Sequence, residues 1–149
     1  MPKLAEISGT VKKHLGRGKR LGYPTANLDT TTDLMDGIYL GLVKKIDGGT
    51  LPPLFLRKLL PQKNLFSPQI GLPALVFVGP AVTFDETKKL IEVHILDFSQ
   101  EIYGAQMKVE VIKKIRDNQK FDNEATLVAQ MKEDERIARE FFSKATSDR

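Results

Sequence analysis

The chain contains no cysteine and no tryptophan among its 149 residues. Without cysteine it can form neither a disulfide framework nor a thiolate metal site, which is compatible with a reducing cytoplasm. Its first eight residues lack the apolar centre of a secretory signal peptide. No apolar run approaches the roughly 20 residues that a membrane-spanning helix needs. We therefore expect a cytoplasmic protein with no membrane partner.

The composition that is present is typical of a globular domain, with 41% hydrophobic and 28% charged residues. The length is sufficient for one core, so we expect a single domain over residues 1–149. The net charge of +4 favours anionic partners, but nucleotides, RNA and acidic membranes all satisfy it. Basic residues gather at positions 12–20 and 108–120, where they can flank an anionic site or form a solvated surface.

Alternating apolar and polar residues between turn residues predict several short strands. They lie at residues 5–11, 38–46, 75–78, 90–98 and 107–115. No helical pattern separates them, which favours an antiparallel barrel or sandwich over βαβ units. In the fourth strand, Val93 and Ile95 face one side while Glu92 and His94 face the other.

The C-terminal segment changes to helical periodicity, and Asp122 or Asn123 can serve as its N-cap. We expect one amphipathic helix that packs on the strands and frays after about Ser143. Its apolar residues are predicted to be core contacts: Leu127, Val128, Met131, Ile137, Ala138 and Phe141.

Residues 51–73 are apolar but contain five prolines, so they cannot form a central strand throughout. A lid, a self-association surface and an excursion packed on the barrel all remain open for this segment.

The most informative segment is residues 16–27, GRGKRLGYPTAN. Its glycines allow backbone amides to approach an anion, and its arginines and lysine add positive charge. The spacing is not that of a Walker P-loop. A phosphate-binding loop and a basic surface loop with turn glycines both fit these residues. Thr25 and Asn27 lie two positions apart, so in an extended backbone both can offer neutral oxygens to one Mg²⁺ ion beside substrate phosphates.

This segment, with PTAN intact at residues 24–27, resembles the signature of the riboflavin kinase (flavokinase) family. Further segments resemble the family in the same order: GIYLG at 37–41, EVHILDF at 92–98, YG at 103–104, IR at 115–116 and KF at 120–121. Residues 43–78 match weakly. The resemblance implies a mainly β fold, a small antiparallel Greek-key barrel of the riboflavin-kinase type with a C-terminal α-helix packed on it.

The same resemblance implies ATP-dependent phosphorylation of the riboflavin 5′-hydroxyl to FMN, assisted by Mg²⁺. Carried over by position, Glu92 is the catalytic base, Thr25 and Asn27 hold the metal, and the flavin lies near Arg116 and Phe121. The nucleotide-binding positions are Gly16, Arg17, Gly18, Lys19, Leu21, Thr25 and His94. Nothing the size of an FMN adenylyltransferase precedes the PTAN loop, so we expect FMN as the final product. The expected partners are riboflavin and ATP, with no specific nucleic acid, and the expected state is a monomer.

Two departures from the family pattern support an alternative. His14 stands where the family more often has glycine, and Val82 replaces a proline. Together with residues 51–73, they favour a flavin- or nucleotide-binding module with weak or lost kinase activity. A small basic barrel that binds RNA is a further alternative, although the chain lacks a series of stacking aromatics. At single positions, Glu92 can simply face water, His94 can be structural, and Phe121 can be a hydrophobic staple.

Overall fold

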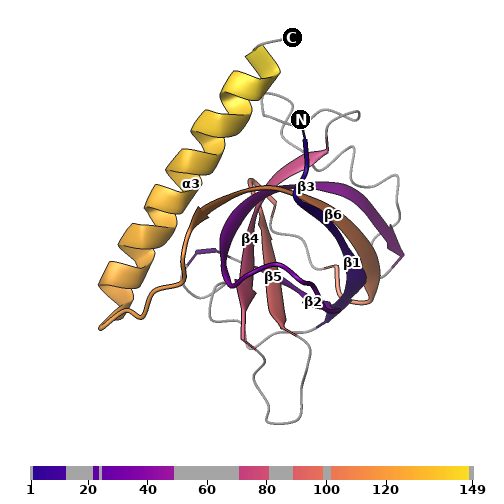
Figure 1. The fold of residues 1–149 in the computed structure, drawn as a ribbon, viewed down its shortest axis with the longest axis horizontal. Coiled ribbons are helices and arrows are strands. Elements are labelled where there is room, and N and C mark those ends of the chain that lie inside the picture. The colour runs from indigo at the N-terminus through magenta and orange to yellow at the C-terminus, as the bar shows by residue number, and fades with distance from the viewer. Residues whose placement is uncertain are drawn as a thin grey trace.

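A computed structural model of the protein describes residues 2–12, 22–23, 25–48, 71–80, 89–98 and 102–147. Within them lie the strands β1 (Ala5–Lys12), β2 (Ala26–Asp29), β3 (Gly37–Gly48), β4 (Leu72–Gly79), β5 (Leu90–Ile95) and β6 (Ala105–Arg116), and the helix α3 (Glu124–Ser147). The strands close into an antiparallel barrel in the order β1-β2-β5-β4-β3-β6 (Figure 1). The predicted mainly β barrel with a C-terminal helix is therefore confirmed.

The barrel interior is filled by alternate residues of each strand, as the two-residue period of a strand requires. On β2 these are Ala26 and Leu28, and on β5 they are Ile91, Val93 and Ile95. Removing these side chains from water is the main favourable contribution to folding. The intervening residues of β2 and β5, including Asn27 and Glu92, consequently lie on the outer face of the barrel.

β3 passes its neighbours closely at Gly41. The pairing of β3 with β6 shifts register between Leu40 and Gly41. A Cβ atom at Gly41 would lie 2.9 Å from a methyl group of Val76 on β4 and 3.2 Å from the carbonyl oxygen of Glu110 on β6. The absence of a side chain at this position therefore allows three strands to approach one another.

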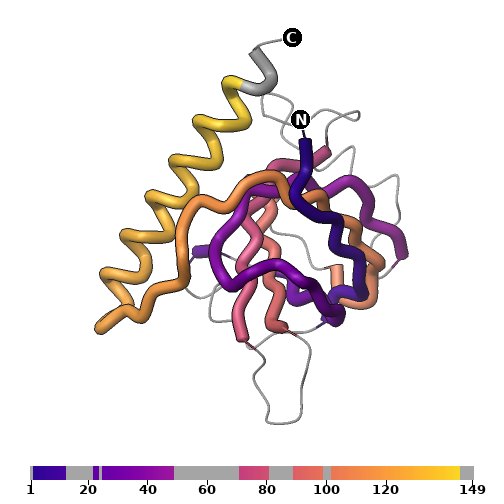
Figure 2. Tube along the Cα trace, in the orientation of Figure 1, coloured from indigo at the N-terminus to yellow at the C-terminus, as the bar shows by residue number. Residues whose placement is uncertain are grey.

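Helix α3 stands along one side of the barrel, as both the ribbon and the tube show (Figures 1 and 2). The amide of Thr126 donates a hydrogen bond to Oδ1 of Asn123 at 2.9 Å, which makes Asn123 the N-cap. Ala138 and Phe142 are buried against outward-facing residues of the sheet in a second core that contains Ile38, Leu40, Leu42, Leu75 and Leu96. Among the described residues, no helix is long and apolar enough to cross a membrane.

The strand predictions need corrections at several boundaries. β2 was not predicted as a strand, because four residues are too few to show a clear alternation. β4 begins at Leu72 instead of residue 75 and includes Pro73, which is tolerated near the start of a strand. β5 ends at Ile95 instead of residue 98, because a turn follows in which Asp97 has a φ of 60°. Residues 51–70 lie outside the described residues.

The helix predictions were correct in kind but wrong in detail. The helix extends to Ser147, four residues past the point where fraying was predicted to begin. Of the predicted core contacts, Ala138 is fully buried, Phe141 packs partly against the second core, and Leu127, Val128, Met131 and Ile137 are only half-buried. Phe142, which was not predicted, is 1% exposed. The face turned to the barrel is thus the i, i+4 row of Asp134, Ala138 and Phe142.

Phe142→Ala should lower the free energy of unfolding by about 3–5 kcal/mol, because it removes a buried aromatic ring and leaves a cavity between helix and barrel. Chemical denaturation monitored by circular dichroism measures this change. Lys144→Ala is the control, since Lys144 is exposed and its ion pair with Glu140 is worth about 0.3–0.5 kcal/mol. Equal stability of the two variants would contradict the packing of α3 described here.

Candidate functional site

The structure brings together four of the predicted site residues on the outer face of β2 and β5. These strands pair antiparallel, and Asn27 lies directly opposite Glu92. Since side chains at directly opposite positions point to the same face of a sheet, the Asn27 amide and the Glu92 carboxylate are neighbours. Thr25 precedes β2 on the same side, and His94 follows Glu92 by two positions along β5.

A hydrogen bond connects the two sequence segments on which the family resemblance depends. The Thr25 hydroxyl donates to Oε2 of Glu92 at 3.2 Å in a partly buried position. A threonine hydroxyl has one hydrogen to donate and two lone pairs to accept with. Donation to Glu92 therefore leaves the Thr25 oxygen able to coordinate a cation.

These oxygens fit a magnesium ion that is shared with a substrate. Within the described part of the chain there is no group of three or more histidine, cysteine, aspartate or glutamate residues that could hold a metal alone. Mg²⁺ seldom uses such a group, because it keeps several waters and binds through one or two protein oxygens together with phosphates. The hydroxyl of Thr25, the amide of Asn27 and the carboxylate of Glu92 are suitable for that mode.

A tyrosine just before β2 closes one side of this group. Tyr23 is only 8% exposed, and its ring meets the His94 ring edge-on, with 5.4 Å between the ring centroids. Burial raises the pKa of Tyr23, and the nearby Glu135 carboxylate of α3 raises this pKa further. The phenol therefore keeps its proton at neutral pH.

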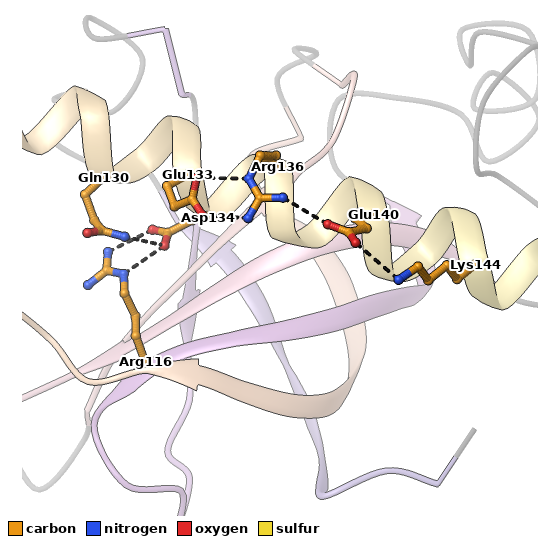
Figure 3. Close-up of polar contacts among 7 residues, drawn as sticks. All are labelled: Arg116, Gln130, Glu133, Asp134, Arg136, Glu140 and Lys144. Atoms are coloured by element: carbon orange, nitrogen blue, oxygen red, sulfur yellow. Dashed lines mark hydrogen bonds and ion pairs between the residues drawn. The ribbon is translucent and has the colours of Figure 1, made fainter.

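Arg116 forms hydrogen bonds with helix α3. Its Nε and Nη2 each donate to the Asp134 carboxylate at 2.8 Å, and Gln130 Nε2 donates to the same carboxylate at 3.1 Å (Figure 3). Asp134 is 3% exposed, so this pair fastens the end of β6 to the helix in a dry position. Phe121 is half-buried in the segment between them. Contact of Arg116 and Phe121 with a flavin stays a prediction.

The remaining predicted positions cannot be placed. Gly16, Arg17, Gly18, Lys19 and Leu21 lie outside the described residues, as do the two departures at His14 and Val82.

Sequence analysis missed Asp134, although a signal was available. Asp134 stands four residues before Ala138, in the row that faces the barrel, where a carboxylate requires a cationic partner. Such a carboxylate within a predicted apolar face indicates a buried ion pair. Its partner, Arg116, lies on a different element, so only the tertiary structure could identify it.

A sequence profile of the Flavokinase family, described as riboflavin kinase, matches residues 1–142. The chain belongs to the riboflavin kinase family. Two relatives illustrate the range of this family. The chain is 32% identical over 143 residues to a riboflavin kinase of Pyricularia oryzae, covering 90% of the chain and 68% of that protein. It is 31% identical over 138 residues to the bifunctional riboflavin kinase/FMN adenylyltransferase of Escherichia coli (strain K12), covering 91% and 37%. The chain spans 18% to 38% of the length of several bacterial relatives that it matches.

Solved structures support the fold. A crystal structure of a Streptococcus pneumoniae protein, described there as a macrolide-efflux protein, shares 36% identity at a TM-score of 0.67, covering 90% of this chain and 38% of that one. The riboflavin kinase of Trypanosoma brucei has a TM-score of 0.56 at 23% identity, covering 93% and 80%, a likeness that concerns the fold alone.

Asp134→Ala should lower the free energy of unfolding by about 3–5 kcal/mol, because Arg116 would lose its bidentate partner in a mostly buried position. Denaturant titration gives the value. Glu133→Ala is the matched control: it removes the adjacent carboxylate, which pairs with Arg136 in water, and should cost less than about 1 kcal/mol. If the two substitutions had the same cost, the Arg116–Asp134 pair would not be what fastens β6 to the helix.

Proposed function

We propose that this chain transfers the γ-phosphoryl group of ATP to the 5′-hydroxyl of riboflavin, giving FMN and ADP. The observation that carries the proposal is the hydrogen bond from Thr25 to Glu92, because it joins the PTAN segment to the strand with the predicted base. Membership of the family supports the same reaction. Phosphoryl transfer requires mainly positioning and stabilisation of negative charge, and a site of this kind suits both.

Glu92 is the proposed general base. The 5′-oxygen attacks the γ-phosphorus, the bond from that phosphorus to the β,γ-bridging oxygen breaks, and the hydroxyl proton passes to the Glu92 carboxylate. The hydrogen bond from Thr25 orients this carboxylate on the outer face of β5. General base catalysis of this kind contributes about 10²–10⁴-fold to the rate.

Thr25 and Asn27 are the proposed protein ligands of the metal. When bound, Mg²⁺ neutralises charge on the ATP phosphates. The two side chains would fix the nucleotide relative to Glu92, because Asn27 lies opposite Glu92 in the paired strands and Thr25 donates a hydrogen bond to the Glu92 carboxylate.

We assign the other roles as the family resemblance implies. The phosphates would be bound by backbone amides and basic side chains of the glycine-rich loop, at Gly16, Arg17, Gly18, Lys19 and Leu21. His94 would contact the nucleotide. Arg116 and Phe121 would border the flavin. We further propose that residues 1–149 form one domain that acts in the cytoplasm as a monomer, with riboflavin and ATP as its partners and no specific nucleic acid.

Purified protein supplied with riboflavin, ATP and Mg²⁺ should form FMN, measured by chromatography with fluorescence detection.

Glu92→Gln should fold normally yet lower kcat by about 10²–10⁴-fold, because the amide cannot accept the proton. Glu110→Gln is the control, since Glu110 is also a partly exposed strand glutamate but pairs with Lys3 on another part of the barrel.

Near-normal turnover of Glu92→Gln would remove Glu92 from the mechanism. Binding of riboflavin or FMN by the unmodified chain, without turnover, would instead favour a binding module that has lost catalysis.

Thr25→Val should raise the Mg²⁺ concentration for half-maximal activity on the order of 10-fold, because it removes one ligand oxygen while keeping the side-chain shape. Thr25→Ser should retain the wild-type Mg²⁺ dependence, since the hydroxyl remains. Thr10→Val makes the same change on β1, where the hydroxyl accepts a hydrogen bond from Gln106. The assignment fails if Thr25→Val and Thr10→Val have the same Mg²⁺ dependence in FMN formation.

A further inference from the structure

A chain of polar contacts connects helix α3 with the segments on either side of the candidate site. The Tyr23 phenol lies close enough to the Glu135 carboxylate for that carboxylate to raise its pKa. Arg139 Nε donates to the same Glu135 at 2.7 Å, and the other two nitrogens of Arg139 donate to Asp97 at 2.8 and 3.1 Å. We call Tyr23, Glu135, Arg139 and Asp97 the α3 network.

The two ends of the α3 network lie next to the two strands of the candidate site. Tyr23 lies two residues before Thr25, at the entry to β2. Asp97 lies two residues after the end of β5, the strand that carries Glu92. One helix therefore holds both the start of the strand with the proposed metal ligands and the exit of the strand with the proposed base.

The contacts around the α3 network hold the turn after β5 in a fixed position relative to the helix. Leu96, next to Asp97, is buried with Ala138 and Phe142 of the helix. Arg139 holds the pKa of Asp97 below its usual range, so the carboxylate stays charged and paired at neutral pH. Asp97 also has a left-handed φ of 60°, a conformation that few residue types adopt readily. The turn after β5 is thus held both by packing and by a bidentate ion pair.

β2 is a four-residue strand with a short ladder on each side. Three residue pairs connect it to β5, from Ala26–Val93 to Leu28–Ile91, and three connect it to β1, from Thr10–Asp29 to Lys12–Asn27. A ladder this short fixes its outer residues weakly, and Thr25 lies beyond the last pair. The relative placement of Thr25 and Glu92 therefore depends on what holds the two strands at their ends.

We propose that the α3 network consists of positioning residues for phosphoryl transfer: it sets the distance between the Thr25 hydroxyl and the Glu92 carboxylate by holding the segments next to both residues to helix α3. This inference rests on the proposed function. Loss of the α3 network lets the PTAN segment and the β5 turn move independently, so the metal ligands and the base no longer converge.

The helix itself provides a matched control. Arg136 makes the same kind of contacts as Arg139, with Glu133 at 2.7 and 3.0 Å and with Glu140 at 2.9 Å, but all of its partners lie on α3 (Figure 3). Arg136→Gln and Arg139→Gln thus each remove a guanidinium with two carboxylate partners from the same helix. Only the second breaks a connection to the strands of the site.

The decisive experiment compares these two variants and Tyr23→Phe, which removes one hydroxyl. Arg139→Gln should lower kcat about 10–100-fold and raise the Mg²⁺ concentration for half-maximal FMN formation, because a small misplacement of reacting groups is costly. Amide hydrogen exchange at residues 26–29 should become faster in the same variant. Arg136→Gln should match the wild type within about twofold in all three measurements. Tyr23→Phe should act in the same direction as Arg139→Gln, and the double variant should lose less than the product of the two single effects.

The outcomes distinguish the positioning role of the α3 network from the proposed kinase activity. If the wild type makes FMN but Arg139→Gln and Tyr23→Phe behave like Arg136→Gln, the positioning role is wrong and the proposed function stands. Lower thermal stability with unchanged kcat and Mg²⁺ dependence would likewise reduce the α3 network to a structural one. If the wild type makes no FMN, the proposed function fails, and the exchange rates at residues 26–29 alone decide whether the helix holds β2. Should Arg139→Gln not fold, Tyr23→Phe provides the same comparison.

Discussion

The pairing of β2 with β5 is the interaction on which the candidate site depends. It is a short ladder that buries Ala26 and Leu28 on one side and aligns Asn27 with Glu92 on the other. Burial of the barrel interior contributes the free energy that keeps these strands together, and the outer face carries the residues of the candidate site. The hydrogen bond from Thr25 to Glu92 then joins residues 67 positions apart in the sequence. No local structure could bring these groups together.

Helix α3 has two sides with different tasks. The side turned to the barrel carries Ala138, Phe142 and the buried carboxylate of Asp134. The other carries Arg136, whose contacts with Glu133 and Glu140 stay within the helix. Surface pairs of this second kind contribute little to stability. The charges that matter to the architecture are those that leave the helix: Asp134 to β6 and Arg139 to the turn after β5.

Local pattern and motif predicted much of this molecule. Alternation located β1, β3, β5 and β6 to within a few residues, because their inner residues fill one core. The intact PTAN segment indicated the family and gave Thr25 and Asn27 as candidate site residues, and the EVHILDF segment gave Glu92; the structure places these three residues side by side. The failures have physical causes. β2 is too short for its period to be visible, and helical periodicity alone could not distinguish Phe141 from its buried neighbour Phe142. The partners of Asp134 and Arg139 lie on distant elements, which no local pattern encodes.

The close approach at Gly41 has a consequence for the whole ring of strands. In the closed order of the described strands, β3 stands three places from β2 in either direction, across the barrel. A methyl group at Gly41 would push against Val76 and the Glu110 carbonyl and so enlarge the circumference. A closed ring has no edge at which to absorb extra width, so the strain would spread to the opposite wall. Gly41 on β3 thus limits how far β2, across the barrel, can stand from its neighbours.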